Sequence, residues 1–305
     1  MDALHTVVEA TETGLENAQA IAPNSNITNN FMDVLNNEDI EGIALATPAE
    51  THAELAIQAM RAGKDVFVEK PMALSIFDAE AMQRVSKETS RILMVGHLLE
   101  YHPAVLKLRE VIKSGELGKI NYIYSNRLNF GKIRTQENAL WSFAPHDIAV
   151  ILRLLHQTPV EVSANGGSYL TRGVDDITIS NLRFSDESRA HIFVSWLHPF
   201  KEQRLVVVGD KKMAIFNDVN SFGKKLMMYP QTVEFQSNLP ILKKEDAEYI
   251  DHAETEPLRE ECAHFIECIE SRNEPLTDGQ SGIEVLKVLH ACQASIKQNG
   301  APVNI

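Results

Sequence analysis

The first hundred residues alternate between short apolar runs and segments in which apolar side chains recur at helical intervals. Residues 43–46 are apolar on both faces, as a central strand of a parallel sheet must be. Residues 50–62 carry apolar side chains at helical spacing, and Gly63 follows at a position where helices commonly end. Strands separated by helices in this order predict a doubly wound parallel sheet. The expected strands are 4–8, 43–46, 65–68 and 92–95, and the expected helices are 14–21, 50–62 and 76–89.

After about Gly96 the pattern changes. Residues 101–114 predict an amphipathic helix, and Pro145, which suits a first helical turn, predicts a helix over 145–155. Short alternating segments then predict an antiparallel or mixed sheet, before two final helices. The expected strands are 120–130, 160–166, 177–184, 190–196, 204–208, 213–216 and 226–229, and the last helices are 257–271 and 282–298.

These elements predict an α/β protein of two domains with a cleft between them. The first, 1–97, is a Rossmann-like dinucleotide-binding domain with a parallel sheet. The second, 98–305, is an α+β domain for substrate binding and oligomerisation, with a large, mostly antiparallel sheet. One face of that sheet must be covered by something, which predicts a homo-oligomer, either a dimer or a tetramer.

Composition narrows the classes of partner. Lys and Arg total 29 against 42 Asp and Glu, which gives a net charge of −13. So acidic a chain repels nucleic acid. A local basic pocket for one phosphorylated metabolite is still compatible with this net charge. The three cysteines, Cys262, Cys268 and Cys292, match no zinc spacing, so neither a metal site nor disulfides are expected. No apolar run approaches the roughly 20 residues of a membrane span, and the first residues do not resemble a signal peptide. We therefore expect a cytoplasmic protein without a membrane partner.

Polar residues follow four of the predicted strands at their carboxyl ends, which is where open parallel sheets bind their ligands. Each has a plainer interpretation, because Thr47 could cap a helix, Lys70 could be a surface charge and His97 could be a core polar group. Their occurrence at successive strand ends favours a site. The four groups are Glu9, Thr47-Pro48, Glu69-Lys70-Pro71 and Gly96-His97.

The residues around these strand ends resemble a known family. Segments 46–52 (Ala-Thr-Pro-Ala-Glu-Thr-His) and 62–71 (Ala-Gly-Lys-Asp-Val-Phe-Val-Glu-Lys-Pro) are similar to the glucose–fructose oxidoreductase/inositol dehydrogenase (Gfo/Idh/MocA) family. Segments 140–147 (Leu-Trp-Ser-Phe-Ala-Pro-His-Asp) and 195–203, with 257–262 and 276–279, look like its branch of UDP-N-acetylglucosaminuronate 3-dehydrogenases of surface-polysaccharide biosynthesis. The resemblance covers nearly the whole chain. It implies an NAD-dependent dehydrogenase that acts on CH–OH, oxidising the 3-hydroxyl of a UDP-N-acetyl-hexuronic acid.

The resemblance implies two catalytic residues. Lys70 matches the family lysine that contacts nicotinamide and substrate, and His146 matches the histidine beside the hydroxyl that is oxidised. The chemistry agrees, because removing hydride from a carbinol requires a base for the hydroxyl proton, and histidine titrates near neutrality. A lysine ammonium can orient the hydroxyl and stabilise negative charge that develops on its oxygen. His146, which we expect near the start of a helix, could alternatively cap or pack that helix.

The resemblance also implies a lining for cofactor and substrate. Glu9 resembles the acid that binds the adenosine ribose, and its charge disfavours the 2′-phosphate of NADP, so NAD is expected. Arg134 suits a carboxylate or diphosphate, with Arg127 and Lys132 nearby as further cations. The other positions that match the cofactor cleft are Thr47, Pro48, His52, Glu69, Lys70 and His97, and the expected substrate wall is Tyr101, Asn129, Arg134, Asn138, Trp141 and Asp147.

Two features depart from the family pattern. No Gly-x-Gly-x-x-Gly occurs in the 305 residues, so the first strand, the glycine turn and the helix that hold a pyrophosphate are expected to be absent. Ser142 stands where much of the wider family has Asp, which we interpret as variation within the branch. Two alternatives follow: a truncated or degenerate paralogue that folds and oligomerises but binds cofactor poorly, and a polyol or inositol dehydrogenase. A metal-dependent hydrolase using His97, His102 and His146 lacks a tight ligand spacing.

Overall fold

The computed structural model describes residues 3–131, 133–135 and 137–305, and the chain forms two compact units. The first unit is Met1–Val95 together with Phe265–Gly279, and the second is Gly96–His264 together with Gln280–Ile305. The boundary expected at residue 97 therefore lies close to the first division. The segment Phe265–Gly279, which we expected in the second domain, belongs instead to the first unit.

Packing explains why Phe265–Gly279 joins the first unit. The ring of Phe265 packs against that of Phe67 with 5.7 Å between their centres. Arg272 donates to both carboxylate oxygens of the buried Asp65, at 2.6 and 3.0 Å. The hydroxyl of Thr277 donates to the backbone oxygen of Val95 at 2.7 Å. These contacts join positions about 200 residues apart, which no local sequence pattern reveals.

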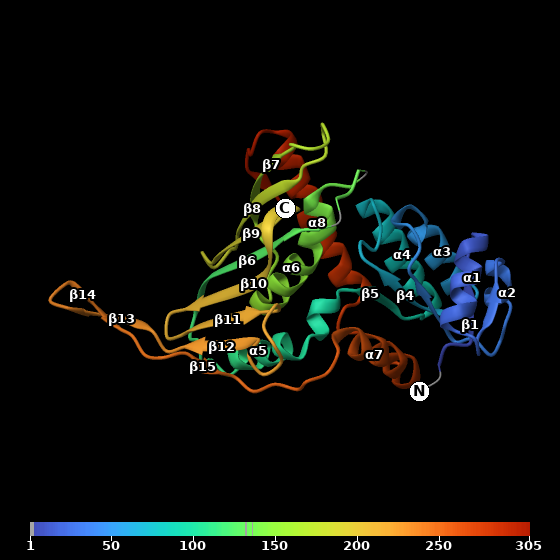
Figure 1. The fold of residues 1–305 in the computed structure, drawn as a ribbon, viewed down its shortest axis with the longest axis horizontal. Coiled ribbons are helices and arrows are strands. Elements are labelled where there is room, and N and C mark those ends of the chain that lie inside the picture. The colour runs from blue at the N-terminus through green and yellow to red at the C-terminus, as the bar shows by residue number, and fades with distance from the viewer. Residues whose placement is uncertain (1–2, 132, 136) are drawn as a thin grey trace. The chain divides into compact units, whose positions relative to one another are not determined.

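The first unit contains the predicted parallel strands with helices between them (Figure 1). Strands β1 and β2 pair in parallel, and β3 pairs in parallel with β4 in a second sheet of order β3-β4-β5. The strands are β1 (Thr6–Val8), β2 (Asn26–Thr28), β3 (Gly42–Leu45), β4 (Asp65–Glu69) and β5 (Leu93–Gly96). The helices are α1 (Glu12–Ile21), α2 (Phe31–Leu35), α3 (Ala49–Arg61) and α4 (Ile76–Thr89). The Rossmann-like prediction is confirmed, and β2 and α2 are additions to it.

One place in this parallel arrangement is unfilled. Among the described residues β1 pairs only with β2, and β3 pairs only with β4, so each has one unpaired edge. A dinucleotide-binding sheet has the strand order 3-2-1-4-5-6, in which the first strand lies between the second and the fourth. The order found here is that of such a sheet without its first strand. Ala44 and Ala46 are exposed although their segment is apolar on both faces, so the described residues leave one face of this segment uncovered.

The second unit is built on a nine-stranded sheet of order β15-β12-β11-β10-β6-β9-β8-β7-β16. Strand β6 runs parallel to β9 and antiparallel to its other neighbour, β10, so the sheet is mixed. Its strands are β6 (Ile120–Phe130), β7 (Glu161–Gly167), β8 (Ile177–Arg183), β9 (Arg189–Ser195), β10 (Leu197–Gly209), β11 (Met213–Asn217), β12 (Leu226–Tyr229), β15 (Glu248–Tyr249) and β16 (Val303–Asn304). A separate hairpin joins β13 (Thr232–Gln236) to β14 (Leu239–Lys243).

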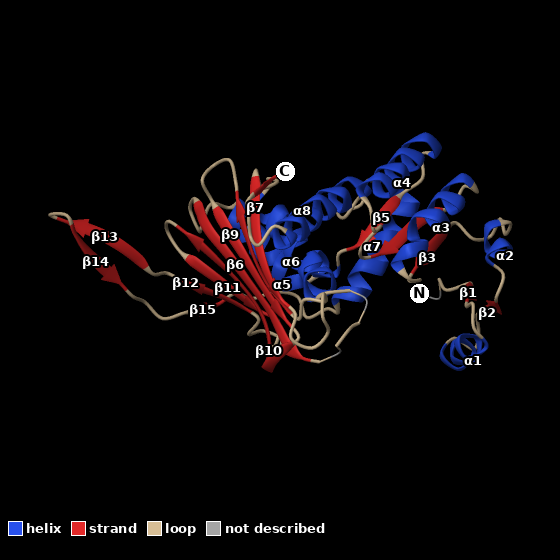
Figure 2. Cartoon of the chain, turned by 90° about the horizontal axis from the view of Figure 1, so that it is seen from above, coloured by secondary structure: helices blue, strands red, loops and turns tan. Residues whose placement is uncertain are grey.

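Helices cover only one face of this sheet (Figure 2). Ile123 and Ile192 are buried on that face, and Ser125 donates to Asp147 of α6 at 2.6 Å. Their sequence neighbours Tyr122 and Tyr124 point to the opposite face, because successive side chains of a strand alternate. The helical elements of this part of the chain are η1 (Leu98–Tyr101), α5 (Pro103–Lys113), α6 (Ala139–Leu155), α7 (Pro257–Ser271) and α8 (Gly279–Lys297).

The start of α6 corrects the sequence prediction. The helix begins at Ala139, well before Pro145, and its N-cap is Asn138, whose side chain accepts from the N–H of Trp141 at 3.1 Å. Pro145 lies inside the helix and His146 follows it there, not near its start. The start of the helix was predicted wrongly because proline is common in a first helical turn. The Asn138 cap sets the actual first turn, six residues before Pro145. The carbonyl of Trp141 loses its usual helical N–H partner at Pro145, since proline has none.

Candidate functional site

In the first unit the site begins at the carboxyl ends of β3 and β4. Because these strands pair in parallel, with Leu45 opposite Val68, the loops that follow them emerge at the same edge. The first loop contributes Thr47 and Pro48, which are exposed, and the second contributes Glu69 and Lys70, which are half-buried. Two of the four predicted strand-end groups thus lie side by side.

The side chain of His52 connects the two loops. It lies in the first turns of α3 with only 1% of its surface exposed. Its Nε2 lies 2.8 Å from the backbone oxygen of Thr47, and its Nδ1 lies 2.9 Å from that of Pro71. Both ring nitrogens are therefore engaged with backbone, so His52 acts at the predicted cofactor cleft by fixing the loops that line it.

Lys70 stands at the turn out of β4. Its N–H donates to Oε2 of Glu69 at 3.2 Å, and its peptide bond to Pro71 is cis. In the neighbouring loop, Thr47 Oγ1 accepts from Thr51 Oγ1 at 2.8 Å, and Pro48 occupies the N-cap position of α3. Lys70 thus follows β4 at the same edge at which Thr47 and the start of α3 follow β3.

Glu9 lies on the separate strand pair. Its N–H donates to the backbone oxygen of Thr28 at 3.0 Å, which extends the β1–β2 pairing by one residue. Its carboxylate lies over the first turn of α1, because a Cβ added to Gly14 would come within 2.6 Å of Glu9 Oε2. Glu9 is exposed, so its oxygens are open to donors such as the hydroxyls of a ribose.

In the second unit, His146 and Asp147 face different environments. His146 is half-buried, whereas Asp147 is 2% exposed and turned to the sheet. Asp147 accepts from Arg127 Nε at 2.9 Å and from Arg127 Nη2 at 3.2 Å. Burial alone would lower the pKa of the Arg127 guanidinium, but the charge and hydrogen bonds of Asp147 raise it overall. Asp147, predicted as a substrate wall residue, and Arg127, predicted as an anion-binding cation, are thus engaged with each other.

A second ion-pair group lies close to Arg127. Asp218 pairs with Lys225 at 2.5 Å and with His102 Nε2 at 3.4 Å. Burial would raise the pKa of Asp218, but the hydrogen bonds from His102 and Lys225 hold it well below its usual value. The charge of Asp218 also favours the charged form of Arg127. His102 is thus part of a structural cluster and makes no metal site in the described chain.

Asn138 and Trp141 are held by a residue that sequence reasoning missed. Gln293 of α8 accepts from Asn138 Nδ2 at 2.8 Å and from Trp141 Nε1 at 3.2 Å. The Trp141 ring also meets His290 edge-on, with 5.1 Å between ring centres. His290 and Gln293 are three residues apart on α8, so they share one face of the helix. In the sequence, the only signal for the role of His290 and Gln293 was their spacing as two polar residues on an otherwise apolar helix face.

The remaining predicted residues of this unit are less closely grouped. His97 is buried at the N-cap position of η1, and the buried Tyr101 ring lies 5.4 Å from that of His264. Asn129 is half-buried on β6. Arg134 is 43% exposed and pairs with Glu137 at 2.8 Å. Lys132 lies outside the described residues.

Within residues 3–131, 133–135 and 137–305, no three His, Cys, Asp or Glu side chains are placed to hold a metal ion. Over the same residues no helix is both long and apolar enough to cross a membrane.

The Gln293 contacts lead to a stability prediction. In Gln293→Leu, the half-buried donors of Asn138 and Trp141 lose their acceptor, which should lower the free energy of unfolding by about 1–2 kcal/mol. Urea unfolding followed by circular dichroism measures this. The matched control is Gln298→Leu at the exposed residue that directly follows the same helix, which should change the free energy by less than about 0.5 kcal/mol. Equal effects of the two substitutions would contradict the role given to Gln293.

Each of the two parts of the chain matches a domain of one protein family. Residues 2–97 match GFO/IDH/MocA, an oxidoreductase family with an NAD-binding Rossmann fold. Residues 105–215 match the GFO/IDH/MocA C-terminal domain. These ranges agree with the parallel sheet of the first unit and with the first part of the mixed sheet in the second.

Individual relatives are distant. The chain is 29% identical over 228 residues to 2,7-anhydro-N-acetylneuraminate hydratase of Mediterraneibacter gnavus, covering 69% of this chain and 60% of that protein. It is 25% identical to UDP-N-acetylglucosamine 3-dehydrogenase of Acidithiobacillus ferrooxidans, covering 81% and 76%. The structure of levoglucosan dehydrogenase in complex with NADH and levoglucosan superposes with a TM-score of 0.83 at 19% identity, covering 99% and 90%.

The match therefore spans only about three fifths of the first of these relatives. Both family matches agree with the observed folds, and together they extend over most of the chain. The chain belongs to the GFO/IDH/MocA oxidoreductase family.

Proposed function

We propose that this chain is an NAD-dependent dehydrogenase that oxidises a hydroxyl of a sugar, most specifically the 3-hydroxyl of a UDP-N-acetyl-hexuronic acid. The observation that carries the proposal is the position of Lys70. It stands at the carboxyl end of a parallel strand, beside the Thr47-Pro48 loop, in a family of oxidoreductases with an NAD-binding fold. Ligands of open parallel sheets bind at that edge.

The residues present fit two of the three parts of NAD. The exposed carboxylate of Glu9 suits the two hydroxyls of the adenosine ribose, and the Thr47 and Lys70 loops suit the nicotinamide end. The pyrophosphate would need a glycine turn and a helix N-terminus between β1 and β3. Among the described residues that place is not filled. We therefore expect NAD to be held at its ends and weakly at its centre, and we expect Glu9 to disfavour NADP by charge repulsion.

Bound NAD would supply the acceptor for the hydride that leaves the carbinol carbon. In this chain His146 would accept the hydroxyl proton, because a histidine imidazole is basic near neutral pH. The Lys70 ammonium would orient the same hydroxyl and stabilise the charge that grows on its oxygen. Arg127 and Asp147, one residue from His146, would act by fixing α6 against β6.

The substrate class rests on resemblance and on the relatives. The motif at 140–147 resembles the nucleotide-sugar branch, and one relative is a UDP-N-acetylglucosamine 3-dehydrogenase. Such a substrate carries a diphosphate, which calls for local cations in a chain of net charge −13. Arg134 is the exposed candidate, since Arg127 is committed to Asp147. The corresponding role is a step in surface-polysaccharide biosynthesis, and an uncharged polyol is the alternative substrate.

The catalytic assignment makes one prediction. Lys70→Ala and His146→Ala should each lower turnover by about a hundredfold or more, because each removes a positioned group for proton transfer or charge stabilisation. Cofactor reduction followed at 340 nm measures turnover, and circular dichroism checks that both variants fold. Normal turnover in a folded variant would remove that residue from the mechanism.

The unfilled strand position makes a second prediction. Grafting the first strand, glycine turn and helix of the Acidithiobacillus ferrooxidans relative onto the N-terminus should raise NAD affinity at least tenfold, about 1.4 kcal/mol. Isothermal titration measures both proteins. The control is the same graft with valines in place of the glycines, whose side chains would block the pyrophosphate. Equal affinity of the ungrafted and grafted chains would contradict the proposed cradle.

Substrate choice makes a third prediction. Arg134→Ala should raise the KM for a UDP-sugar acid while leaving kcat nearly unchanged, because it removes binding shared by ground and transition states. It should change the KM for inositol or glucose far less. The control is Arg172→Ala, which removes an arginine outside the proposed wall. A preference for the uncharged sugar, or an Arg134→Ala effect that is equal on both substrates, would favour the polyol alternative.

A further inference from the structure

A row of polar side chains crosses neighbouring strands on the helix-covered face of the large sheet. The register pairs Arg127 of β6 with Gln203 of β10, and the N–H of Asp218, directly after β11, donates to the backbone oxygen of Gln203 at 2.9 Å. Residues paired in this way across a sheet hold their side chains about 5 Å apart on one face. Backbone register therefore places the Gln203 amide between a guanidinium and a carboxylate.

The chemistry of these two neighbours fixes the orientation of the Gln203 amide. An arginine side chain carries only donors and an ionised carboxylate only acceptors, so the amide oxygen faces Arg127 and the amide nitrogen faces Asp218. In that orientation Gln203 accepts from Arg127 Nη1 at 3.2 Å and donates from Nε2 to Asp218 Oδ2 at 3.1 Å. Nε and Nη2 of Arg127 both donate to Asp147. All three nitrogens of the guanidinium thus have a partner, which fixes its plane.

Asp218 is itself held from its other side. Lys225 pairs with it at 2.5 Å, and Nε2 of the buried His102 lies 3.4 Å from its Oδ1. Nδ1 of His102 accepts from a backbone N–H of α5 at 3.1 Å, so the proton of the neutral ring is on Nε2, which faces Asp218. With two cations and two carboxylates the group is electrically balanced, and removing any one charge would leave another without its partner.

The group leaves little free volume around it. A cavity of about 10 Å³ lies among Ser125, Arg127, Asp147 and Gln203, and apolar side chains such as that of Phe216 also line it. A volume of that size holds one water molecule at most. The side chains of the group therefore depend on one another for hydrogen bonds, because solvent replaces a lost partner poorly there.

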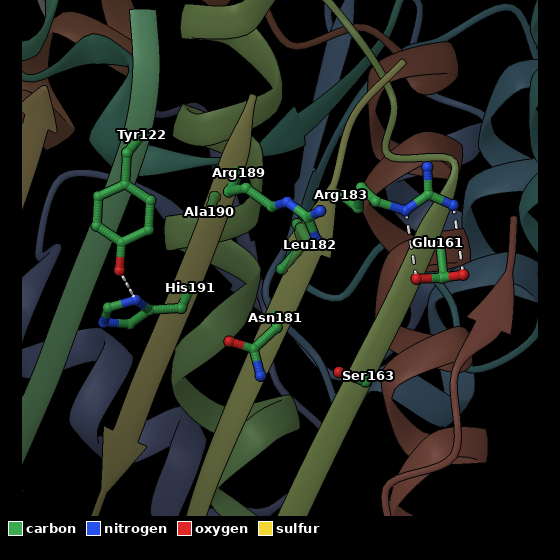
Figure 3. Close-up of a pocket in the computed structure, with 9 residues that line it drawn as sticks. All are labelled: Tyr122, Glu161, Ser163, Asn181, Leu182, Arg183, Arg189, Ala190 and His191. Carbon is green, nitrogen blue, oxygen red and sulfur yellow. Dashed lines mark hydrogen bonds and ion pairs between the residues drawn. The ribbon is translucent and has the colours of Figure 1, made fainter. Parts of the chain in front are cut away.

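The group is separate from the larger recess of the same sheet. Figure 3 shows that recess, of about 430 Å³, with the hydrogen bond of Tyr122 to His191 at one side and the ion pair of Arg183 with Glu161 at the other. Tyr122 lies on the helix-free face, because it alternates along β6 with side chains that point to the helices. The setting of Arg127 is thus determined on the helix-covered face alone.

The group reaches His146 through α6. Asp147 follows His146 directly, and successive residues of a helix point about 100° apart, so fixing Asp147 on the sheet sets the direction of His146. The backbone supports this turn less than others, since Pro145 supplies no N–H to the carbonyl of Trp141. The orientation of His146 therefore depends on how firmly Asp147 is seated on Arg127.

We propose that Gln203 is a positioning residue for His146. By joining Arg127 to Asp218 it holds the guanidinium plane on which Asp147 is seated, and Asp147 holds the turn of α6 that carries His146. The inference rests on the proposed function, in which His146 is the base for the sugar hydroxyl. Gln203 is also the member of the group that can be replaced without leaving a charge unpaired, so its substitution tests geometry and not charge.

The first test measures how His146 is held and requires no catalytic activity. Diethyl pyrocarbonate modifies neutral imidazoles, and mass spectrometry of the His146 peptide gives the rate, with the exposed His5 as internal reference. Gln203→Met nearly keeps the volume of the side chain but makes neither hydrogen bond. It should raise the modification rate of His146 about threefold or more, because this turn of α6 then opens more often.

Two further variants make this test specific. Gln203→Asn keeps an amide that is one methylene shorter and spans the gap less well, so it should raise the rate in the same direction. The matched control is Gln157→Met, at a half-buried glutamine of the same unit that accepts from the Ser185 hydroxyl at 3.0 Å, and it should leave the rate of His146 unchanged. Circular dichroism confirms folding of each variant.

The second test is kinetic. With NAD and UDP-N-acetylglucosaminuronate as substrates, Gln203→Met should lower kcat about tenfold and leave both KM values nearly unchanged, because a displaced base weakens the transition state and not the binding of substrate. A side chain that serves stability alone would lower the free energy of unfolding without this split between kcat and KM.

The outcomes separate this proposal from the proposed function. Equal modification rates of His146 in the wild type and both Gln203 variants, equal effects of Gln203→Met and Gln157→Met, or an unchanged kcat in Gln203→Met would each overturn the positioning role, while an active wild type would leave the proposed function standing. A wild type without dehydrogenase activity would contradict the proposed function, and the modification rates would still decide whether Gln203 positions His146.

Discussion

The parallel pairing of β3 with β4 is the constraint on which the candidate site depends. Backbone hydrogen bonds fix the relative height of the two strands, so their carboxyl ends cannot separate. Thr47 and Lys70 are thereby presented at one edge, although they are 23 positions apart in the chain. His52 completes the arrangement by contacting the backbone of both loops from a buried position. The position of Lys70 relative to Thr47 thus depends on the register between β3 and β4.

The same kind of pairing is incomplete on the other side of β3. Backbone N–H and C=O groups on the unpaired edges of β1 and β3 lack ladder partners among the described residues. The region beyond that gap is thinly packed: α1 buries only Ala18, and its Ile21 is 84% exposed. Glu9 is therefore positioned by a three-residue strand pair and a lightly anchored helix. The proposed ribose contact of Glu9 therefore depends on a lightly packed part of the first unit.

The two faces of the large sheet in the second unit have different surroundings. Helix α6 packs on one face, where Arg127 and Asp147 lock it to β6, and this lock sets where His146 is displayed. The opposite face has no helices and continues toward the projecting hairpin. A large sheet allows this division because alternate side chains of each strand serve different faces. Changes on the helix-free face can therefore leave His146 undisturbed.

The sequence by itself determined the alternation of strands and helices, because hydrophobic periodicity is a local property. Residues 43–46 and 65–68 were readable as buried parallel strands, and Glu9, Lys70 and His146 stood out through motif and position. Tertiary structure decided what periodicity does not encode. Asp147 proved to be a buried partner of Arg127, Gln293 proved to hold Trp141, and Phe265–Gly279 joined the first unit through Phe67 and Asp65. These outcomes depend on contacts between residues far apart in the chain, and such contacts exist only once the sheets have formed.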